Sequence, residues 1–198
     1  MKMSKEAKRP VVIPSFEQVE AERKRLRRRS EYLRALRGTL NVLIVVAAIA
    51  ILVAMLYLPV LQAVGSSMEP TLHDGDIIVL SITDDFAIGD LCGFYYQNKL
   101  LLKRVIGLPG NYIEIDSEGT VYVDGQELDE PYVTEKSLGE CDIKFPYQVP
   151  DGRIFVLGDH RATSIDSRST VIGSIEKEQI VGRVLFRIWP LNSISTIS

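Results

Sequence analysis

The stretch Gly65-Ser66-Ser67-Met68-Glu69-Pro70-Thr71-Leu72 divides the 198-residue chain into two parts of different character. It follows the one long apolar run and precedes an alternating segment that is typical of a β-strand. Proline fixes its own backbone φ angle, so Pro70 predicts a turn here. A serine in such a turn is most often a loop hydrogen-bonder, and Ser67 could act as a nucleophile only if the chain supplies a base.

The uncharged segment before this stretch is long enough to cross a membrane. No charged residue occurs between Arg37 and Glu69, and residues 42–58 contain no strongly polar side chain. With its flanks the segment exceeds the roughly 20 residues that a ~30 Å hydrocarbon core requires. We therefore predict a transmembrane anchor helix over residues 39–62. A cleavable signal peptide is the alternative, but its apolar region is usually only about 7–15 residues long.

Charge is distributed unevenly around this segment. Residues 1–37 carry twelve Lys and Arg against five Asp and Glu, whereas residues 38–198 carry eleven against twenty-one. A basic flank beside an apolar run favours anionic lipid over nucleic acid as its partner. The positive-inside rule then predicts a cytoplasmic basic tail, residues 1–38, and an extracytoplasmic domain, residues 63–198. The predicted location is the cell membrane, crossed once, and the predicted partner of the anchor is the lipid bilayer.

The sequence after Ser67 has the pattern of β structure. Short runs rich in branched and aromatic residues alternate with Asp/Gly turns. We predict strands over residues 76–82, 91–97, 99–106, 112–116, 120–123, 153–157 and 179–189, a hairpin turn at Asp124-Gly125, and an irregular excursion over residues 129–150. The predicted fold class is mostly β: one N-terminal transmembrane helix, then many short, largely antiparallel strands.

Lys103 is the best candidate for a base that activates Ser67. It lies inside the apolar run Leu100-Leu101-Leu102-Lys103-Arg104-Val105-Ile106. Burial of an ammonium group is costly and lowers the pKa of a lysine, which leaves part of the amine neutral and able to accept a proton. The alternative is a lysine that reaches solvent at a strand edge. The two histidines, His73 and His160, are weaker candidates because neither belongs to a recognisable Ser-His-Asp pattern.

A third polar block follows the strand at residues 153–157. It reads Gly158-Asp159-His160-Arg161, and three residues later Ser164-Ile165-Asp166-Ser167-Arg168. Ser164, Asp166 and Arg168 alternate, so an extended backbone would place them on one side. Asp166 and Arg168 could form a salt bridge that holds the loop, and Ser164 could orient an amine base.

Two cysteines, Cys92 and Cys141, are too few for a disulfide framework and lack metal-ligand spacing. The sequence leaves open whether they pair. Cys92 lies in an apolar run and fits a small buried hydrophobe. No metal site or cofactor is predicted.

Together the three blocks resemble bacterial type I signal peptidase, also called leader peptidase. The resemblance runs from the anchor to Trp189-Pro190-Leu191-Asn192 and rests on Ser-Met-x-Pro-Thr-Leu, Lys-Arg-Val-Ile-Gly-Leu-Pro-Gly, and Gly-Asp-x-Arg with Ser-x-Asp-Ser-Arg. It implies that Ser67 is the nucleophile, that Lys103 is its general base and that Ser164 orients the lysine. It also implies that Asp159, Asp166 and Arg168 support the site. Two departures are His160 at a position that is commonly Asn, and Gly65 where some members place a serine of the oxyanion hole.

The resemblance implies a membrane-anchored serine endopeptidase that removes signal peptides from precursors emerging from the secretion machinery. Cleavage would follow small residues at −1 and −3, and Met68, Leu72 and Leu102 are candidate walls of the substrate pocket. The substrate would lie extended along strand-like edges near residues 61–64 and 101–103. Two other classes stay open: a non-catalytic membrane-tethered β binding module, and a sortase-like Cys transpeptidase that would use Cys92.

Overall fold

The structure is a computed structural model that describes residues 15–197, apart from the side chain of Met55. The first part of the predicted basic tail, residues 1–14, lies outside the described residues. The chain divides into two compact units, Met1–Leu52 and Val53–Ser198. The first contains most of a long helix and the second contains the strands.

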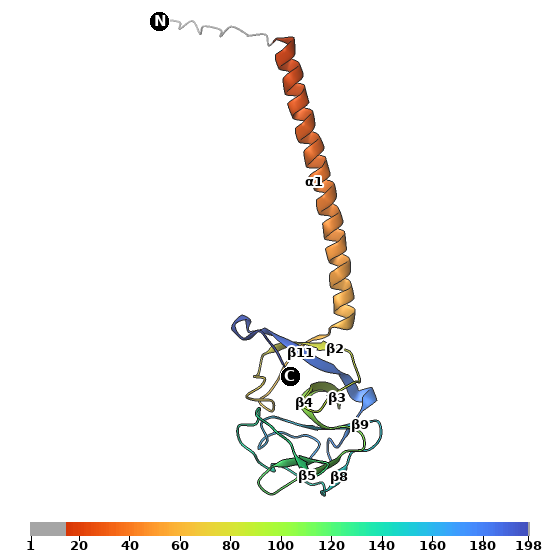
Figure 1. The fold of residues 1–198 in the computed structure, drawn as a ribbon, viewed down its shortest axis with the longest axis vertical. Coiled ribbons are helices and arrows are strands. Elements are labelled where there is room, and N and C mark those ends of the chain that lie inside the picture. The colour runs from red at the N-terminus through yellow and green to blue at the C-terminus, as the bar shows by residue number, and fades with distance from the viewer. Residues whose placement is uncertain (1–14, 198) are drawn as a thin grey trace, which may run out of the picture. The chain divides into compact units, whose positions relative to one another are not determined.

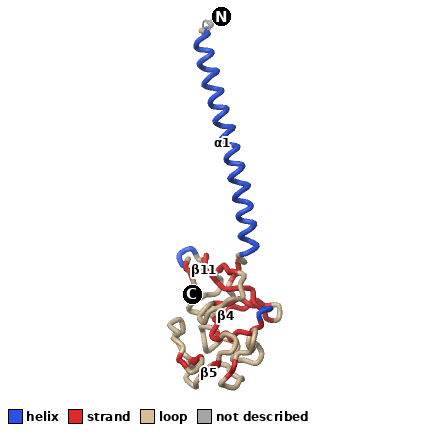
Figure 2. The backbone as a smooth tube through the Cα atoms, turned by 45° about the vertical axis from the view of Figure 1, so that its right-hand side comes forward, coloured by secondary structure: helices blue, strands red, loops and turns tan. Residues whose placement is uncertain are grey.

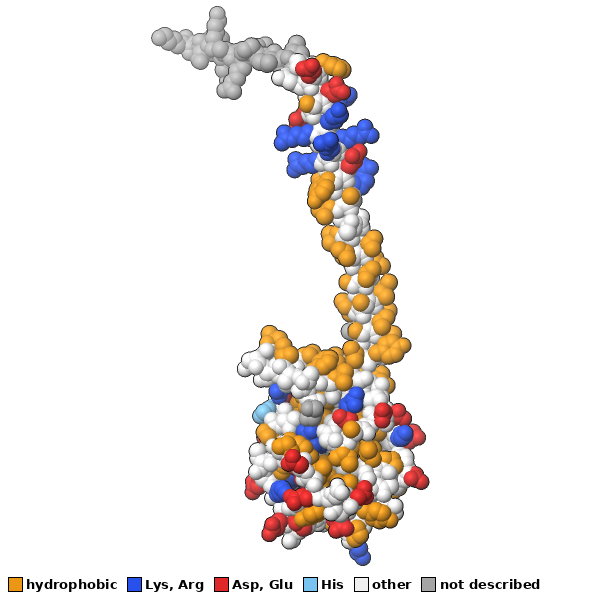
Figure 3. Space-filling model, viewed as in Figure 1, with side chains coloured by type: hydrophobic (Ala, Val, Ile, Leu, Met, Phe, Trp, Pro, Cys, Tyr) orange, Lys and Arg blue, Asp and Glu red, His pale blue; other side chains and the backbone are white. Residues whose placement is uncertain are grey.

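The helix α1 runs without interruption from Phe16 to Tyr57. Lys and Arg side chains gather on its N-terminal part, and apolar side chains cover the part nearer Tyr57 (Figure 3). Within it, Phe16–Ala54 is long and apolar enough to cross a membrane, with a mean hydropathy of 2.3 in its most apolar window and no burial there. An apolar helix with no protein face to cover it is typical of a membrane anchor.

The predicted end of the anchor helix at residue 62 is wrong. The helix ends at Tyr57, and Val60–Gln62 forms the strand β1. Pro59 explains the early end, because proline has no N–H to donate and restricts the residue before it to extended conformations.

The second unit consists of two antiparallel sheets (Figures 1 and 2). The larger sheet has the order β1-β2-β11-β3-β4-β9-β10, with β12 paired to β11, and the smaller has the order β7-β6-β5-β8. The strands of the larger sheet are β1 (Val60–Gln62), β2 (Ile77–Ser81), β3 (Leu91–Tyr96), β4 (Lys99–Gly107), β9 (Arg153–Leu157), β10 (Ile175–Glu176), β11 (Ile180–Trp189) and β12 (Ser195–Thr196). The strands of the smaller sheet are β5 (Tyr112–Ile115), β6 (Val121–Val123), β7 (Gln126–Glu127) and β8 (Tyr147–Gln148), and two short 3-10 helices are η1 (Lys177–Gln179) and η2 (Leu191–Ser193).

All seven predicted strands are present, with ends within two residues of those expected, so the mostly β fold class is confirmed. The predicted hairpin is also present, because β6 pairs with β7 across Asp124-Gly125, and Asp124 has a positive φ of 52°. The sequence did not predict the short strands β1, β8, β10 and β12. Strands of two or three residues have too little alternation to be distinguished from loops.

Three apolar clusters form the core, and one of them supports the Gly65–Leu72 stretch. Met68 and Leu72 are buried against Ile78 and Leu80 of β2 and Val184 of β11. A second cluster joins the two sheets, and there the rings of Tyr147 and Phe155 lie 5.5 Å apart. The stretch that carries Ser67 is therefore packed on the larger sheet.

Candidate active site

Ser67 lies in the loop between β1 and β2, and the ends of this loop are closed by hydrogen bonds. The Ala63 N–H donates to the Asp76 carbonyl at 2.8 Å, and the Gly65 N–H donates to Asp74 Oδ1 at 2.8 Å. Gly65 has a φ of +88°, which glycine adopts without strain. With Met68 and Leu72 anchored in the core, the backbone around Ser67 has little freedom to move.

Lys103 reaches Ser67 from β4. Its Nζ and the Ser67 Oγ are 2.6 Å apart, although the two residues are 36 positions apart in sequence. The side chain of Lys103 is almost fully buried, with 3% exposed. A protonated amine donates in this hydrogen bond, whereas a neutral amine can accept the serine proton.

Burial lowers the pKa of Lys103 to about 8. The negative charges of Asp166 and Asp159 oppose this shift, and the positive charge of Arg168 adds to it. Desolvation has the largest effect on the pKa, because the buried ammonium loses its hydration shell and has no carboxylate in direct contact. The amine is therefore partly neutral near neutral pH, as a general base requires.

Asp159 connects the serine loop to β4. Its carboxylate accepts two hydrogen bonds from Arg104, at 2.9 and 2.8 Å, and one from the Thr71 hydroxyl at 2.5 Å. The sequence did not single out Arg104 or Thr71. A signal existed for Arg104, because a second cation in the same apolar strand requires a buried carboxylate.

The predicted salt bridge between Asp166 and Arg168 is present and fully buried. Arg168 Nε and Nη2 each donate to a different oxygen of Asp166 at 2.9 Å. Asp166 Oδ2 also accepts the Gly158 N–H at 2.9 Å. Because Gly158 directly precedes Asp159, the ion pair fixes the start of the turn that holds the serine loop.

Ser164 lies beside Ser67 but does not make the hydrogen bond expected with Lys103. Its hydroxyl is buried and has no hydrogen-bond partner among the described residues, and the side-chain hydrogen bond of Lys103 Nζ is made to Ser67 Oγ. The space is tight: a Cβ at Gly158 would lie 2.2 Å from Ser164 Oγ and 2.6 Å from the Ser67 carbonyl oxygen. The structure thus brings Ser164 to the site and leaves its donor free.

Neither histidine ring is hydrogen-bonded to Ser67 Oγ. The His160 ring contacts the Thr163 hydroxyl at 2.8 Å, and His73 is exposed. The contribution of His160 is its backbone, whose N–H donates to the Ser67 carbonyl at 3.1 Å. A histidine base is not supported by this geometry.

Cys92 has the surroundings of a structural residue. It is fully buried, and burial together with the negative charge of Asp90 raises the pKa of its thiol to about 12. Both Cys92 and Cys141 are free thiols, so they do not pair. A nucleophilic cysteine reacts as a thiolate, and the raised pKa of Cys92 keeps its thiol protonated near neutral pH.

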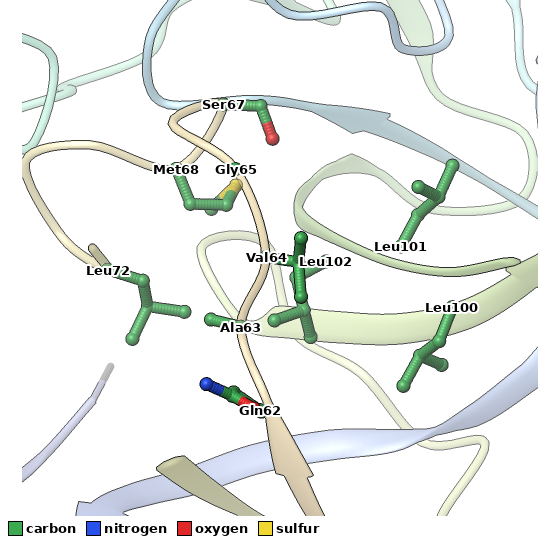
Figure 4. Close-up of a pocket in the computed structure, with 10 residues that line it drawn as sticks. All are labelled: Gln62, Ala63, Val64, Gly65, Ser67, Met68, Leu72, Leu100, Leu101 and Leu102. Carbon is green, nitrogen blue, oxygen red and sulfur yellow. The ribbon is translucent and has the colours of Figure 1, made fainter. Parts of the chain in front are cut away.

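A pocket opens beside Ser67 between two segments of backbone (Figure 4). Met68, Leu72 and Leu102, the three predicted wall residues, all line it. The other lining residues are Gln62, Ala63, Val64, Gly65, Ser67, Leu100 and Leu101. The walls are mostly aliphatic. No cluster of His, Cys, Asp and Glu suited to a metal ion occurs within residues 15–197.

The chain is similar to known proteins over most of its length. Residues 36–189 match the family described as signal peptidase, peptidase S26. Signal peptidase I of Bacillus licheniformis is 35% identical over 166 residues, which cover 77% of this chain and 88% of that protein. Signal peptidase IB of Staphylococcus aureus is 36% identical over 149 residues, which cover 65% of this chain and 76% of that protein.

A crystal structure of a signal peptidase I from Enterococcus faecalis V583 overlaps 50% of this chain and 97% of its own, with 27% identity and a TM-score of 0.43. The family match covers most of the chain, and relatives above 30% identity extend over most of their own length. The chain therefore belongs to the signal peptidase family, peptidase S26.

Proposed function

We propose that this protein cleaves signal peptides from secreted precursors, with Ser67 as the nucleophile and Lys103 as its general base. The observation that carries the proposal is the 2.6 Å contact between Ser67 Oγ and a buried Lys103 Nζ. The lowered pKa of Lys103, about 8, makes the amine a competent proton acceptor. Relatives that are 35% and 36% identical to this chain are named signal peptidases, which supports the substrate class.

In the first step Ser67 Oγ attacks the scissile carbonyl while its proton passes to Lys103 Nζ. The lysine then gives this proton to the leaving amine, and an acyl-enzyme remains on Ser67. Lys103 next takes a proton from water, which attacks the ester carbonyl; the bond to Ser67 Oγ then breaks, Lys103 returns the proton to Ser67 Oγ, and the acid is released. The Ser67 N–H donates no hydrogen bond within the described residues, so it is available to the oxyanion. Removing one such donor typically costs about 10²–10³ in rate.

Two free strand edges border the pocket and suit an extended substrate. β1 is the end strand of its sheet and pairs only with β2. In β4, residues 99–103 pair only with β3, because pairing with β9 begins at Arg104. A peptide that adds main-chain hydrogen bonds to these edges would place its side chains in the pocket. Met68, Leu72 and Leu102 would then admit small side chains at −1 and −3.

Residues near the site would act through Ser67 and Lys103. The Ser164 hydroxyl has no partner within residues 15–197, so its oxygen is suited to accept a hydrogen bond from Lys103 Nζ when the lysine turns away from Ser67. Asp159, Asp166 and Arg168 hold the surrounding backbone through buried ion pairs. The proposal requires no cofactor.

The proposed location is the cell membrane, with the basic tail in the cytoplasm and the catalytic unit outside. The excess of Lys and Arg before the apolar part of α1 supports this orientation through the positive-inside rule. The substrates would be preproteins that emerge from the secretion machinery, and α1 would hold the enzyme in the bilayer that they cross.

The test is cleavage of a signal-peptide-bearing precursor by the full chain in phospholipid–detergent micelles. Ser67→Ala and Lys103→Ala should each abolish cleavage while the fold is retained. The matched controls are Ser66→Ala and Lys144→Ala, which remove an exposed serine next to Ser67 and an exposed lysine that does not line the pocket. Cleavage that survives either active-site change would overturn the Ser-Lys mechanism. A wild-type chain that binds precursors without cleaving them would favour a binding module.

A further inference from the structure

The irregular segment predicted over residues 129–150 contacts three arginines that hold the site. Its residues 130–139, which we call the clasp, meet three arginines of the site motifs. Glu130 pairs with Arg161, and the Tyr132 ring lies over Arg104 with the guanidinium carbon 3.8 Å from its centroid. The Ser137 and Leu138 carbonyls accept from Arg168 at 3.2 and 2.7 Å.

Glu130 is the central member of the clasp. Both of its oxygens accept hydrogen bonds from Arg161, and the carboxylate also accepts from the Tyr132 hydroxyl at 3.2 Å. The side chains of Glu130 and Arg161 are 0% and 1% exposed. A buried bidentate pair of this kind has a fixed geometry, because the planar guanidinium matches the carboxylate.

Arg161 connects Glu130 to the turn that supports Ser67 through hydrogen bonds. Its Nε donates to the Gly158 carbonyl at 3.0 Å, and its own carbonyl accepts from Arg168 Nη2 at 2.9 Å. Residues 158–161 are therefore held at both ends. The middle of this turn carries Asp159, which binds Thr71 in the serine loop, and the His160 N–H, which donates to the Ser67 carbonyl.

The charges around the turn show that Glu130 has no substitute. Asp159 pairs with Arg104, and Asp166 pairs with Arg168. Glu130 is the one carboxylate in a salt bridge with Arg161 among the described residues. Without it, the Arg161 guanidinium would be buried without a counter-charge, and it could relieve that cost only by moving.

We propose that Glu130 is a positioning residue for catalysis: through Arg161 it fixes the Gly158–His160 turn, and through this turn it sets the place of Ser67. The inference rests on the proposed function, because it assumes that Ser67 attacks the substrate. Glu130 itself touches neither the pocket nor Lys103. Its loss should therefore affect the rate of acylation and leave substrate binding unchanged.

The experiment compares Glu130→Gln with wild type and with Glu127→Gln, a control in an exposed pair with Lys136 of the same region. Precursor cleavage is measured with the full chain in micelles, and rates are normalised to the fraction of enzyme titrated by a serine-acylating reagent. Glu130→Gln should lower kcat about 10- to 100-fold, as expected for a small displacement of a reacting group. KM should stay within about twofold, the pattern of an interaction lost in the transition state. The control should match wild type.

The double variant Glu130→Gln/Arg161→Met separates positioning from stability. It removes both charges, so the thermal stability lost in the single variant should return. The Gly158 carbonyl still lacks its donor, so kcat should stay low. A double variant that regains wild-type kcat with its stability would overturn the proposal, as would a folded Glu130→Gln variant with wild-type kcat.

These outcomes are distinct from a failure of the proposed function. If wild type does not cleave, or if Ser67→Ala cleaves normally, the proposed function fails and the positioning role falls with it. If wild type cleaves through Ser67 and Glu130→Gln cleaves equally well, only the role of Glu130 is refuted.

Discussion

The pH dependence of cleavage is the most direct consequence of the buried lysine. Lys103 must be neutral to accept the Ser67 proton, and burial lowers its pKa from 10.5 to about 8. We therefore expect kcat/KM to fall about tenfold for each pH unit below 8, because kcat/KM reports the ionisation of the free enzyme.

The size of the effect follows from the shift. At pH 7 a lysine with a pKa of about 8 is about 9% neutral, whereas one with a pKa of 10.5 is only about 0.03% neutral. Burial thus raises the concentration of active base about 300-fold, which corresponds to about 3 kcal/mol. Asp166 raises the pKa of Lys103, so neutralising it in Asp166→Asn should move the acid limb to lower pH.

The assay is cleavage of an internally quenched peptide with small residues at −1 and −3, measured from pH 5 to 10 on the full chain in micelles. Asp85→Asn, which removes an exposed carboxylate, serves as the control and should leave the limb in place. An acid limb near pH 6.5 that disappears in His160→Ala would refute the reasoning, because that range is typical of histidine. A flat profile between pH 6 and 9 would refute it as well.

Four further predictions follow from the same contacts. Lys103→Met should stabilise the fold by about 3 kcal/mol at pH 7. Below pH 8 Lys103 is charged in both the folded and the unfolded chain, so the cost of burying the charge is present in full and so is the gain from removing it. Above pH 10.5 the lysine is neutral in both states, and the gain should vanish. Calorimetry of the full chain in detergent measures it, and equal stability at pH 7 would contradict it. Asp166→Asn leaves Arg168 buried without its counter-charge and should cost about 3–5 kcal/mol in the same calorimetry, where a loss below about 1 kcal/mol would contradict the reasoning. Gly158→Ala places a Cβ 2.6 Å from the Ser67 carbonyl and should lower kcat about 100-fold, whereas Gly38→Ala, with open space around it, should match wild type. Cys92→Ala should retain wild-type kcat/KM in the peptide assay, since its buried thiol has no place in the reaction, and loss of activity in a folded variant would point to thiol chemistry.

The strands of the catalytic unit could be predicted because they are long enough to alternate. β2, β4 and β11 have clear patterns of apolar residues bounded by turns, and their positions in the structure agree with the prediction. The boundary of the anchor helix was placed too late, at residue 62, because apolar character continues past Pro59 into β1. Hydropathy alone cannot separate the end of an apolar helix from a short apolar strand that follows it.

The candidate site was predicted mainly as residue types, and of the contacts that hold it the sequence predicted the Asp166–Arg168 salt bridge. Lys103 was visible as a charge in an apolar strand, and Ser67 was visible through its neighbours. Arg104 was equally visible but was not used, although it binds Asp159. The partnership of Glu130 and Arg161 joins residues 31 positions apart, and no local pattern marks it.

By itself the sequence predicted the apolar helix, the mostly β fold class and the candidate residues of the site, because hydropathy, alternation and motif spacing are local properties of the chain. Only the tertiary structure decided that Lys103 Nζ lies 2.6 Å from Ser67 Oγ and that Ser164 does not reach the lysine. It also decided that the clasp contacts three arginines of the site. These contacts depend on how distant segments pack around buried charges, since a buried charge is stable only where the whole fold brings it a partner.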